Sequence, residues 1–216
     1  MSNIIELKNI SKTFDNKKKI TVLKNLNFKF KKGKIYSLSG PSGSGKSTLL
    51  NLLSLIDRPS SGSIKIDNEN INYNEIETND KIRSNNIGIV YQEKNLLPDF
   101  TAIENVCIAS LAANNNHKMA EQESLKIIQK VGLKDRTNHY PSELSGGELQ
   151  RIAISRAIVN KPRIILADEP TGSLDHENAN QIFNLLFKLK NNDRVIIFAT
   201  HNRFFANKAD YKISLS

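Results

Sequence analysis

Short apolar runs and longer amphipathic segments alternate along this chain, a pattern that predicts an α/β fold with a parallel sheet. Residues 34–39, 163–167 and 194–199 are largely apolar runs of the kind that form strands buried on both faces. Residues 63–67 and 87–91 have the length and composition of further strands. We therefore expect a parallel sheet whose strands are joined by right-handed crossovers.

The N-terminal part has a different pattern, with two strand-like segments at residues 4–7 and 22–30 that flank a predicted turn at Asp15-Asn16. Consecutive strands joined by a turn pair antiparallel. We expect a small antiparallel β-subdomain here, in front of the parallel sheet.

Helical periodicity appears in three places. Residues 47–55 predict a helix, and residues 101–131 predict helical structure that is interrupted by a polar surface loop at residues 114–116. A further helix is expected after Ser145. Because no internal repeat or long linker separates these segments, the helical part, roughly residues 93–160, is predicted to be an insertion in one core.

The 216 residues are enough for one sizeable core, and no stretch approaches the roughly 18 to 20 apolar residues that a membrane-spanning helix needs. Residues 1–10 lack the apolar segment of a signal peptide and predict a strand. The single cysteine, Cys107, cannot form an internal disulfide, and we interpret it as a small buried side chain. We expect the chain to work in the cytosol.

The net charge of +9 raises the question of a nucleic-acid partner. The basic residues at 17–19 and 29–34 alternate with apolar residues near the N-terminus, as on the solvent-facing side of an antiparallel sheet, and no aromatic ladder accompanies them. We therefore expect no nucleic-acid partner. A solvated face is the favoured interpretation, with attraction to an anionic membrane surface as the alternative.

The sequence Gly40-Pro41-Ser42-Gly43-Ser44-Gly45-Lys46-Ser47 follows a predicted strand and opens a predicted helix. Glycines let the backbone curl so that successive N–H groups point at phosphates, and the helix N-terminus adds its positive dipole end. Lys46 would contact the β- and γ-phosphates, and Ser47, next to the hydroxyl of Thr48, would ligate Mg²⁺. This loop predicts a nucleoside triphosphate site.

Two acidic residues follow the apolar run 164–167 at a predicted strand end, where open α/β sheets bind ligands. Asp168 could hold Mg²⁺ through water, and Glu169 could polarise the water that attacks the γ-phosphate. The alternative role for such an acidic pair is helix capping.

The sequence Leu144-Ser145-Gly146-Gly147-Glu148 predicts a second phosphate-binding helix N-terminus, with Ser145 as the capping residue and exposed backbone donors behind it. One nucleotide does not need two such cradles from one chain. We therefore expect the second cradle to serve the nucleotide of a partner subunit, in a two-fold homodimer.

With these motifs in this order, the chain resembles the ATP-binding subunits of ABC transporters over its whole length, residues 1–216 forming one nucleotide-binding domain. The resemblance implies a P-loop NTPase core of the RecA-like type, with ATP and Mg²⁺ as cofactors. It assigns catalytic roles to Lys46, Glu169 and His201, and Mg²⁺ contacts to Ser47, Gln92 and Asp168. It assigns nucleotide contacts to Phe14, Gly40, Pro41, Ser42, Gly43, Ser44, Gly45, Lys46, Ser47, Thr48, Gln92, Ser145, Gly146, Gly147 and Asp175.

Two positions depart from the usual family pattern. Glu148 stands where the signature often has Gln, and Phe14 replaces a more usual Tyr as the ring that stacks on adenine. A core position is the alternative interpretation of Phe14. His201 ends a buried strand and is expected to contact the γ-phosphate, whereas His117, His139 and His176 are expected to be surface or capping residues.

Three segments have sequences similar to those of the ATPases of bacterial lipoprotein-releasing systems: residues 95–106, 138–143 and 167–175. This likeness implies two integral membrane permease subunits as partners, and a peripheral position on the cytoplasmic face of the inner membrane. A sister ATPase of a macrolide or peptide exporter, or of a cell-division complex, is the alternative.

The ATPase domains of DNA-repair and cohesion proteins carry coiled-coil insertions or two cassettes per chain, and neither fits this sequence. A non-hydrolysing nucleotide-binding module is disfavoured by Glu169 and His201.

Overall fold

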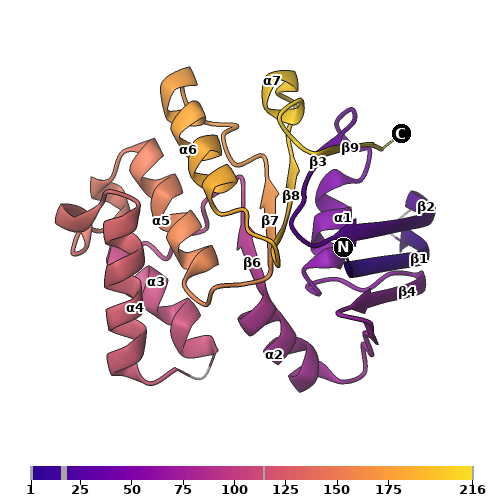
Figure 1. The fold of residues 1–216 in the computed structure, drawn as a ribbon, viewed down its shortest axis with the longest axis horizontal. Coiled ribbons are helices and arrows are strands. Elements are labelled where there is room, and N and C mark those ends of the chain that lie inside the picture. The colour runs from indigo at the N-terminus through magenta and orange to yellow at the C-terminus, as the bar shows by residue number, and fades with distance from the viewer. Residues whose placement is uncertain (1, 16–18, 114, 216) are drawn as a thin grey trace. The chain divides into compact units, whose positions relative to one another are not determined.

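The structure of the protein is a computed structural model that describes residues 2–15, 19–113 and 115–215 (Figure 1). The chain divides into two compact units. The first contains residues 1–83 and 190–216, and the second contains residues 84–189. Each unit has its own strands and helices.

The first unit contains a four-stranded antiparallel sheet with the order β2-β1-β4-β5. Its strands are β1 (Asn3–Asp15), β2 (Lys19–Lys31), β4 (Ser61–Ile66) and β5 (Glu69–Asn70). The antiparallel subdomain predicted from the N-terminal pattern is confirmed, although β1 and β2 are longer than the apolar segments indicated. Asn16 of the predicted turn and Lys17 and Lys18 of the basic run lie outside the described residues.

Side chains of β2 alternate between two environments. Leu26, Phe28 and Phe30 lie on the side that packs, and Lys29 and Lys31 are exposed on the other side. Phe28 and Phe30 stack edge-on against Tyr36, with ring centroids 5.9 and 5.0 Å away. The basic residues of this strand therefore form a solvated face, as the alternation predicted.

Three parallel strands complete the first unit: β3 (Ile35–Ser39) lies between β8 (Val195–Ala199) and β9 (Tyr211–Ser214). They are accompanied by the helices α1 (Lys46–Leu53), α2 (Ile76–Asn86) and α7 (Arg203–Ala206). All five residues of β8 are buried, in agreement with the apolar run that predicted it. Helix α2 was not predicted, because its residues are mostly polar and give no helical periodicity.

The second unit contains β6 (Ile87–Val90) paired in parallel with β7 (Ile164–Asp168). Helices α3 (Ala102–Ala112), α4 (His117–Lys130) and α5 (Gly146–Ile158) pack against one another, and α5 also contacts β6 and α6 (His176–Lys188) (Figure 1). Short 3₁₀ turns at Lys134–Arg136 and Pro141–Glu143 lie between α4 and α5.

The predicted break in the helical region is confirmed as the connection between α3 and α4, although Asn114 is outside the described residues. Thr101 begins α3 with a capping box, in which its hydroxyl accepts from the Glu104 amide while the Glu104 carboxylate accepts from the Thr101 amide. Asn116 caps α4 through the Met119 amide. Among the described residues, no helix has the length and hydropathy needed to cross a bilayer.

Candidate functional site

The glycine loop lies between the end of β3 and the start of α1. Gly40, Gly43 and Gly45 have φ values of 147°, 82° and 91°. A Cβ atom at Gly45 would lie 2.9 Å from side-chain carbons of both Val22 and Leu23, and one at Gly40 would lie 2.5 Å from Ser44 Oγ. Both positions therefore require glycine for backbone angle and for space. Gly45 caps α1 with no side-chain hydrogen bond, so the first turn offers its amides to a ligand.

Lys46 is the first residue of α1 and is only 7% exposed. Its ammonium donates to the carbonyl oxygens of Gly40 at 2.9 Å and Pro41 at 3.0 Å. These two bonds fold the side chain back over the loop from which it emerges. The cation is thus held at the curl of the loop, where the sequence predicted a phosphate contact.

His201 follows β8 at the same end of the three parallel strands as the glycine loop. The amide of Thr200 donates to the carbonyl of Leu38 at 3.3 Å, which aligns the ends of β8 and β3. His201 and Gly40 consequently line one cavity. The structure therefore brings together two of the motifs that lie 161 positions apart in the sequence.

Phe14 lies near the end of β1 and is 38% exposed, so the interpretation of this ring as a core residue is wrong. The ammonium of Lys12 lies 5.0 Å from the ring centroid, a cation–π arrangement. That ammonium is anchored by Asp57 at 2.7 Å and by the Arg58 carbonyl at 2.9 Å. An exposed aromatic ring with one cation fixed nearby is available for stacking, which keeps the adenine prediction open.

The second unit carries the acidic pair. Asp168 is the last residue of β7, as predicted, and Glu169 adopts a left-handed conformation with φ of 43°. The chain then turns, with the Gly172 amide donating to the Glu169 carbonyl at 3.0 Å. A Cβ atom at Gly172 would lie 3.5 Å from Gln92 Nε2 and 3.6 Å from Glu169 Cβ. Gln92 and Glu169 therefore border the same small glycine.

The strand before Gln92 ends one residue earlier than predicted. The pairing of β6 with β7 stops at Val90, opposite Ala167, so Tyr91 is already outside the sheet. Gln92 itself is exposed. The prediction that it follows directly on a strand is corrected by this one residue.

Ser145 is confirmed as the N-cap of α5. Its hydroxyl accepts from the Glu148 amide at 3.3 Å, and the Glu148 carboxylate accepts from the Ser145 amide at 2.8 Å. Arg136 donates through Nε to the same carboxylate at 3.0 Å. Together the Ser145 bonds and the Arg136 guanidinium hold the pKa of Glu148 at about 2. Glu148 is therefore ionised at neutral pH and fixes the start of the signature helix.

Gly147 does not have the exposed backbone that the sequence suggested, because it is buried under Asn178 of α6. A Cβ atom at Gly147 would lie 2.9 Å from Asn178 Cγ. Asn178 is held there by Asp175, the N-cap of α6, whose carboxylate accepts from the Asn178 amide at 2.9 Å and from its side chain at 2.5 Å. These bonds lower the pKa of Asp175. The second glycine of the signature therefore serves close packing, while Gly146 stays exposed.

Arg156 of α5 joins the signature helix to the segment after Gln92. Its guanidinium donates to the carbonyls of Asn95 at 2.6 Å and Lys94 at 2.7 Å. Lys94 in turn donates through Nζ to Ser173 Oγ at 2.6 Å, in the turn that follows Glu169. Side chains thereby link the signature helix to the residues after Gln92, and link those residues to the turn before Asp175. No sequence pattern pointed to Arg156, because its partners are backbone carbonyls 61 and 62 positions away.

Replacing Arg156 with methionine is expected to loosen the segment after Gln92. Each charged hydrogen bond contributes about 1.5–3 kcal/mol, so losing two should raise local amide exchange by about tenfold or more. Hydrogen exchange of residues 92–97, followed by mass spectrometry, measures this. Arg151→Met is the matched control, because Arg151 on the same helix donates to Gln181 at 3.0 Å instead. Equal exchange in the two variants would contradict the assigned link.

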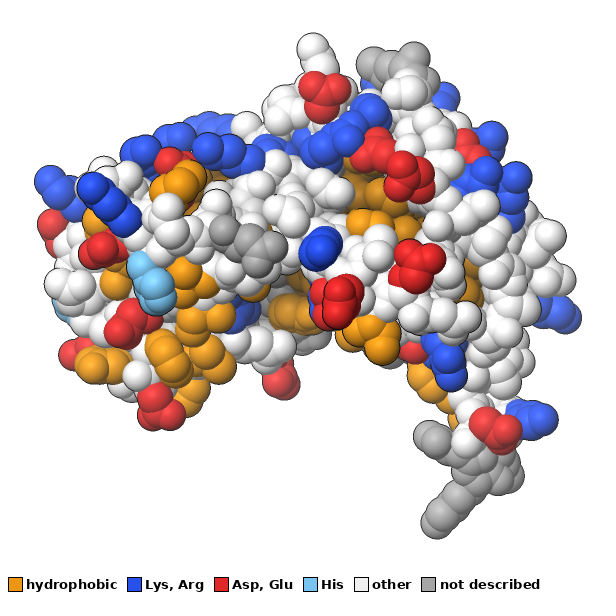
Figure 2. Space-filling view, turned by 90° about the horizontal axis from the view of Figure 1, so that it is seen from below, with side chains coloured by type: hydrophobic (Ala, Val, Ile, Leu, Met, Phe, Trp, Pro, Cys, Tyr) orange, Lys and Arg blue, Asp and Glu red, His pale blue; other side chains and the backbone are white. Residues whose placement is uncertain are grey.

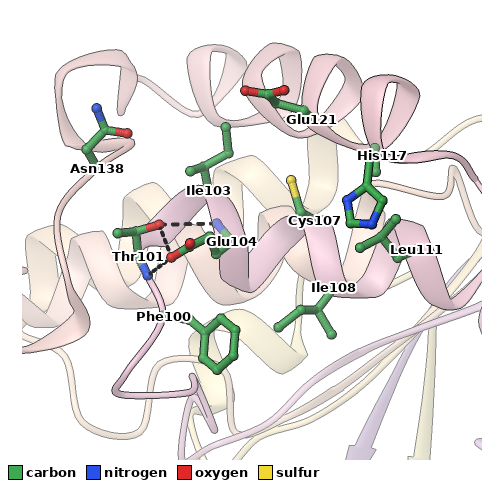
Figure 3. A pocket seen from close by; sticks show the side chains of 11 residues that line it. Phe100, Thr101, Ile103, Glu104, Cys107, Ile108, Leu111, His117, Glu121 and Asn138 are labelled. Carbon is green, nitrogen blue, oxygen red and sulfur yellow. Dashed lines mark hydrogen bonds between the residues drawn. The ribbon is translucent and has the colours of Figure 1, made fainter.

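A cavity of about 540 Å³ lies between α3 and α4 (Figure 3). Ile103 and Cys107 point from α3 toward α4, whereas Phe100 and Ile108 point to the opposite side of α3. Figure 2 shows apolar side chains gathered at this end of the second unit beside histidine and acidic side chains. Cys107 is half-buried and lines the cavity, so its interpretation as a small buried side chain is wrong. Partial burial raises the pKa of its thiol.

Known proteins share the sequence that carries these features. The profile of the ABC transporter family matches residues 23–172. The chain is 45% identical over 218 aligned residues to the lipoprotein-releasing system ATP-binding protein LolD of Rickettsia bellii, covering 99% of this chain and 96% of that protein. It is 40% identical to LolD of Cytophaga hutchinsonii, with the same coverage.

The chain belongs to the ABC transporter family. It is therefore an ATP-binding subunit whose ATPase activity is coupled to transport, as the sequence motifs predicted.

Solved structures of ABC cassettes have the same fold as this ABC ATPase. The dimeric post-hydrolysis structure of the ATP-binding cassette MJ0796 bound to ADP and Pi superimposes with a TM-score of 0.91 at 37% identity, covering 99% of this chain and 94% of that one. A second dimeric structure of MJ0796 gives 0.90 at 39% identity. The predicted fold class, a P-loop NTPase with a parallel sheet and an N-terminal antiparallel sheet, is confirmed.

Proposed function

We propose that this chain is the ATP-hydrolysing subunit of a lipoprotein-releasing ABC system. It works as a homodimer with two integral membrane permease subunits, bound peripherally at the cytoplasmic face of the inner membrane. The observation that carries the proposal is the 40–45% identity to LolD proteins of several bacteria over nearly the whole length of both chains. Likeness confined to the glycine loop would support only nucleotide binding.

The glycine loop and Lys46 bind the phosphates of ATP. Lys46 is already bent over the loop by its bonds to Gly40 and Pro41, so its charge requires little reorganisation to meet the β- and γ-phosphates. The uncapped first turn of α1, from Lys46 through Thr48, adds backbone amides and hydroxyls. His201 contacts the γ-phosphate, and the exposed ring of Phe14 stacks on adenine.

Ser47, Gln92 and Asp168 are the residues that would hold Mg²⁺, as the family resemblance implies. Their hydroxyl, amide and carboxylate oxygens are the hard donors that this ion prefers, and such a set leaves positions for water and phosphate oxygens. When bound, Mg²⁺ neutralises charge on the phosphates. Glu169 orients and polarises the attacking water. Its left-handed backbone and the turn at Gly172 set the direction in which its side chain extends from the main chain.

The start of α5 serves the nucleotide of the partner subunit. Ser145 and Gly146 are exposed, and Gly147 lets α6 approach the helix start closely. A helix N-terminus whose first turn faces solvent stabilises a phosphate that another subunit presents. Because both copies carry the same loop and the same signature, two equivalent sites form in a two-fold dimer.

A cytoplasmic segment of a permease subunit occupies the cavity between α3 and α4. Ile103 offers an apolar surface toward α4, Phe100 and Ile108 line the cavity from the other side of α3, and Glu104 and Glu121 add negative charge at its edge. The complementary occupant is an apolar helix that carries a basic residue. Both α3 and α4 pack against α5, and Arg156 of α5 binds the segment after Gln92, so movement of that helix would be passed to this segment.

Cys107 provides a probe of this docking, because it is the only cysteine in the chain and lines the cavity. Maleimide labelling of Cys107 should be at least about tenfold slower in the complex purified with its membrane subunits than in the isolated chain. A permease helix that binds the cavity with a few kcal/mol of free energy keeps it occupied, and the reagent then cannot reach the thiol. Mass spectrometry follows the reaction. The control places Asn184→Cys, exposed on α6, in a Cys107→Ser background. Equal labelling of Cys107 in both preparations would reject this docking position.

Depletion of the chain in its native bacterium tests the biological role. Outer-membrane lipoproteins should then accumulate in the inner membrane, measured by sucrose-gradient separation of the two membranes and immunoblotting. Because each dimer needs both sites, a Glu169→Gln copy expressed beside the native chain should cause the same defect. Normal lipoprotein sorting with impaired drug efflux or septation would reject lipoprotein release and favour a sister exporter or cell-division ATPase.

A further inference from the structure

A second cavity, of about 400 Å³, lies at the ends of the parallel strands in the first unit. It is lined by Gly40 of the glycine loop and His201, and also by Arg203, Asn207 and Lys212. We propose that this cavity is a subsite for inorganic phosphate, the anion that leaves after ATP hydrolysis. The inference rests on the proposed nucleotide-binding role of the glycine loop and adds a route for its product.

The backbone holds these groups together. The amide of Leu215 donates to the Ser39 carbonyl at 2.9 Å, which keeps β9 beside the start of the glycine loop. Asn202 caps α7 by accepting from the Phe204 amide at 2.9 Å, so Arg203 begins a helix at the cavity edge. The cavity is therefore bounded by two strand ends and a capped turn of helix.

The cavity has a positive character. Arg203 and Lys212 each bring a full charge, and none of the described residues that line it is acidic. Lys212 donates through Nζ to Asn207 Oδ1 at 2.6 Å, which fixes its ammonium at the cavity. The carboxylate nearest in sequence, Asp210, is bound to Lys190 at 2.8 Å and to the Ile35 amide at 2.7 Å. Its charge is thus already compensated by other groups.

Phosphate fits this set of groups better than an apolar or cationic ligand does. A tetrahedral anion takes several donors at once, and Arg203 offers a planar fork while Lys212 offers a fixed ammonium. At about 30 Å³ for each water, the cavity has room for about a dozen waters, enough for a hydrated phosphate.

The position of Gly40 and His201 gives the subsite its place in the reaction. Both border the cavity, and the proposed roles of the loop and of His201 put the γ-phosphate beside them. After cleavage, ADP keeps its phosphates at Lys46, and the free phosphate meets Arg203 and Lys212 without passing an acidic lining residue. Two cations beside the loop draw the product away from ADP and so oppose the reverse reaction.

Binding of inorganic phosphate to the ADP- and Mg²⁺-loaded protein tests the proposal, measured with radiolabelled phosphate by equilibrium dialysis. Charge-assisted hydrogen bonds contribute about 1.5–3 kcal/mol each, so Arg203→Gln with Lys212→Gln should weaken phosphate binding by at least about tenfold. Arg203→Lys, which keeps the charge, should bind more tightly than Arg203→Gln. Lys208→Gln is the matched control, because Lys208 lies over the Phe204 ring at 4.2 Å and does not line the cavity.

Phosphate binding that is equal in the double variant and the native chain would overturn the proposal, because the anion would then bind at the glycine loop. Absence of phosphate binding to the native chain would overturn it as well. The single variants and thermal unfolding separate loss of the subsite from loss of the fold. Absence of ATPase activity in the native complex would instead contradict the proposed function.

Discussion

Lys46→Ala is expected to reduce ATP hydrolysis by at least about a hundredfold, the cost of removing one preorganised donor at a site where charge develops. Lys46 is the only lysine or arginine in the loop from Gly40 to Ser47, so no neighbour can replace its charge. Release of phosphate from ATP by the purified complex measures the effect.

The same substitution removes two hydrogen bonds inside the loop, to Gly40 and Pro41, so the fold must be monitored separately. Lys188→Ala, an exposed lysine in the last turn of α6, is the control for loss of a positive charge. Thermal unfolding of both variants shows whether the fold remains intact. A Lys46→Ala protein that folds and hydrolyses ATP at the native rate would disprove the assignment of this loop.

Glu169→Gln is expected to stop hydrolysis while ATP stays bound, so that two chains remain together around two nucleotides. Glutamine keeps the size of the side chain and its hydrogen-bonding capacity but loses the charge that polarises water. Light scattering with saturating ATP and Mg²⁺ should give twice the 24.3 kDa mass of one chain. The dimer should dissociate when ATP is replaced by ADP.

Adding Ser145→Arg to Glu169→Gln should abolish this dimer and leave ATP binding to the glycine loop intact, because the long side chain starts at the exposed beginning of α5. Fluorescent-nucleotide titration checks the second half of that statement. Ser142→Arg, on the exposed 3₁₀ turn before α5, provides a matched control. If Glu169→Gln and the double variant form the same dimer, the signature does not face the partner's nucleotide.

The sequence predicted those parts of the fold whose physics is local. Continuous apolar runs indicated β7 and β8, because a strand buried on both faces has apolar residues at every position. The glycine loop was evident because only glycine tolerates the backbone angles that point several amides at one anion. Capping residues such as Ser145 were evident because the hydrogen bond joins residues three apart.

Elements without an apolar face were not predicted, and α2 is the clearest example, since its sequence gives no helical period. The burial of Gly147 was also missed, because the side chain that covers it comes from α6, 31 residues later in the chain. The half-exposure of Cys107 depends on the space left between α3 and α4, which composition does not determine.

The sequence by itself thus determined the chemistry of this protein: a phosphate-binding loop, an acidic strand end, a signature helix and the family to which they belong. Only the tertiary structure decided which side chains hold these parts in place. Arg136 binds Glu148 and Arg156 binds the Asn95 carbonyl, at sequence separations that no motif specifies. Asn178 is bound by the nearby Asp175, but the glycine that it covers lies on another helix. The same holds for the cavity where Gly40 and His201 meet Arg203 and Lys212. Motifs are local because bond geometry is local, whereas contacts across a fold depend on packing that many residues set together.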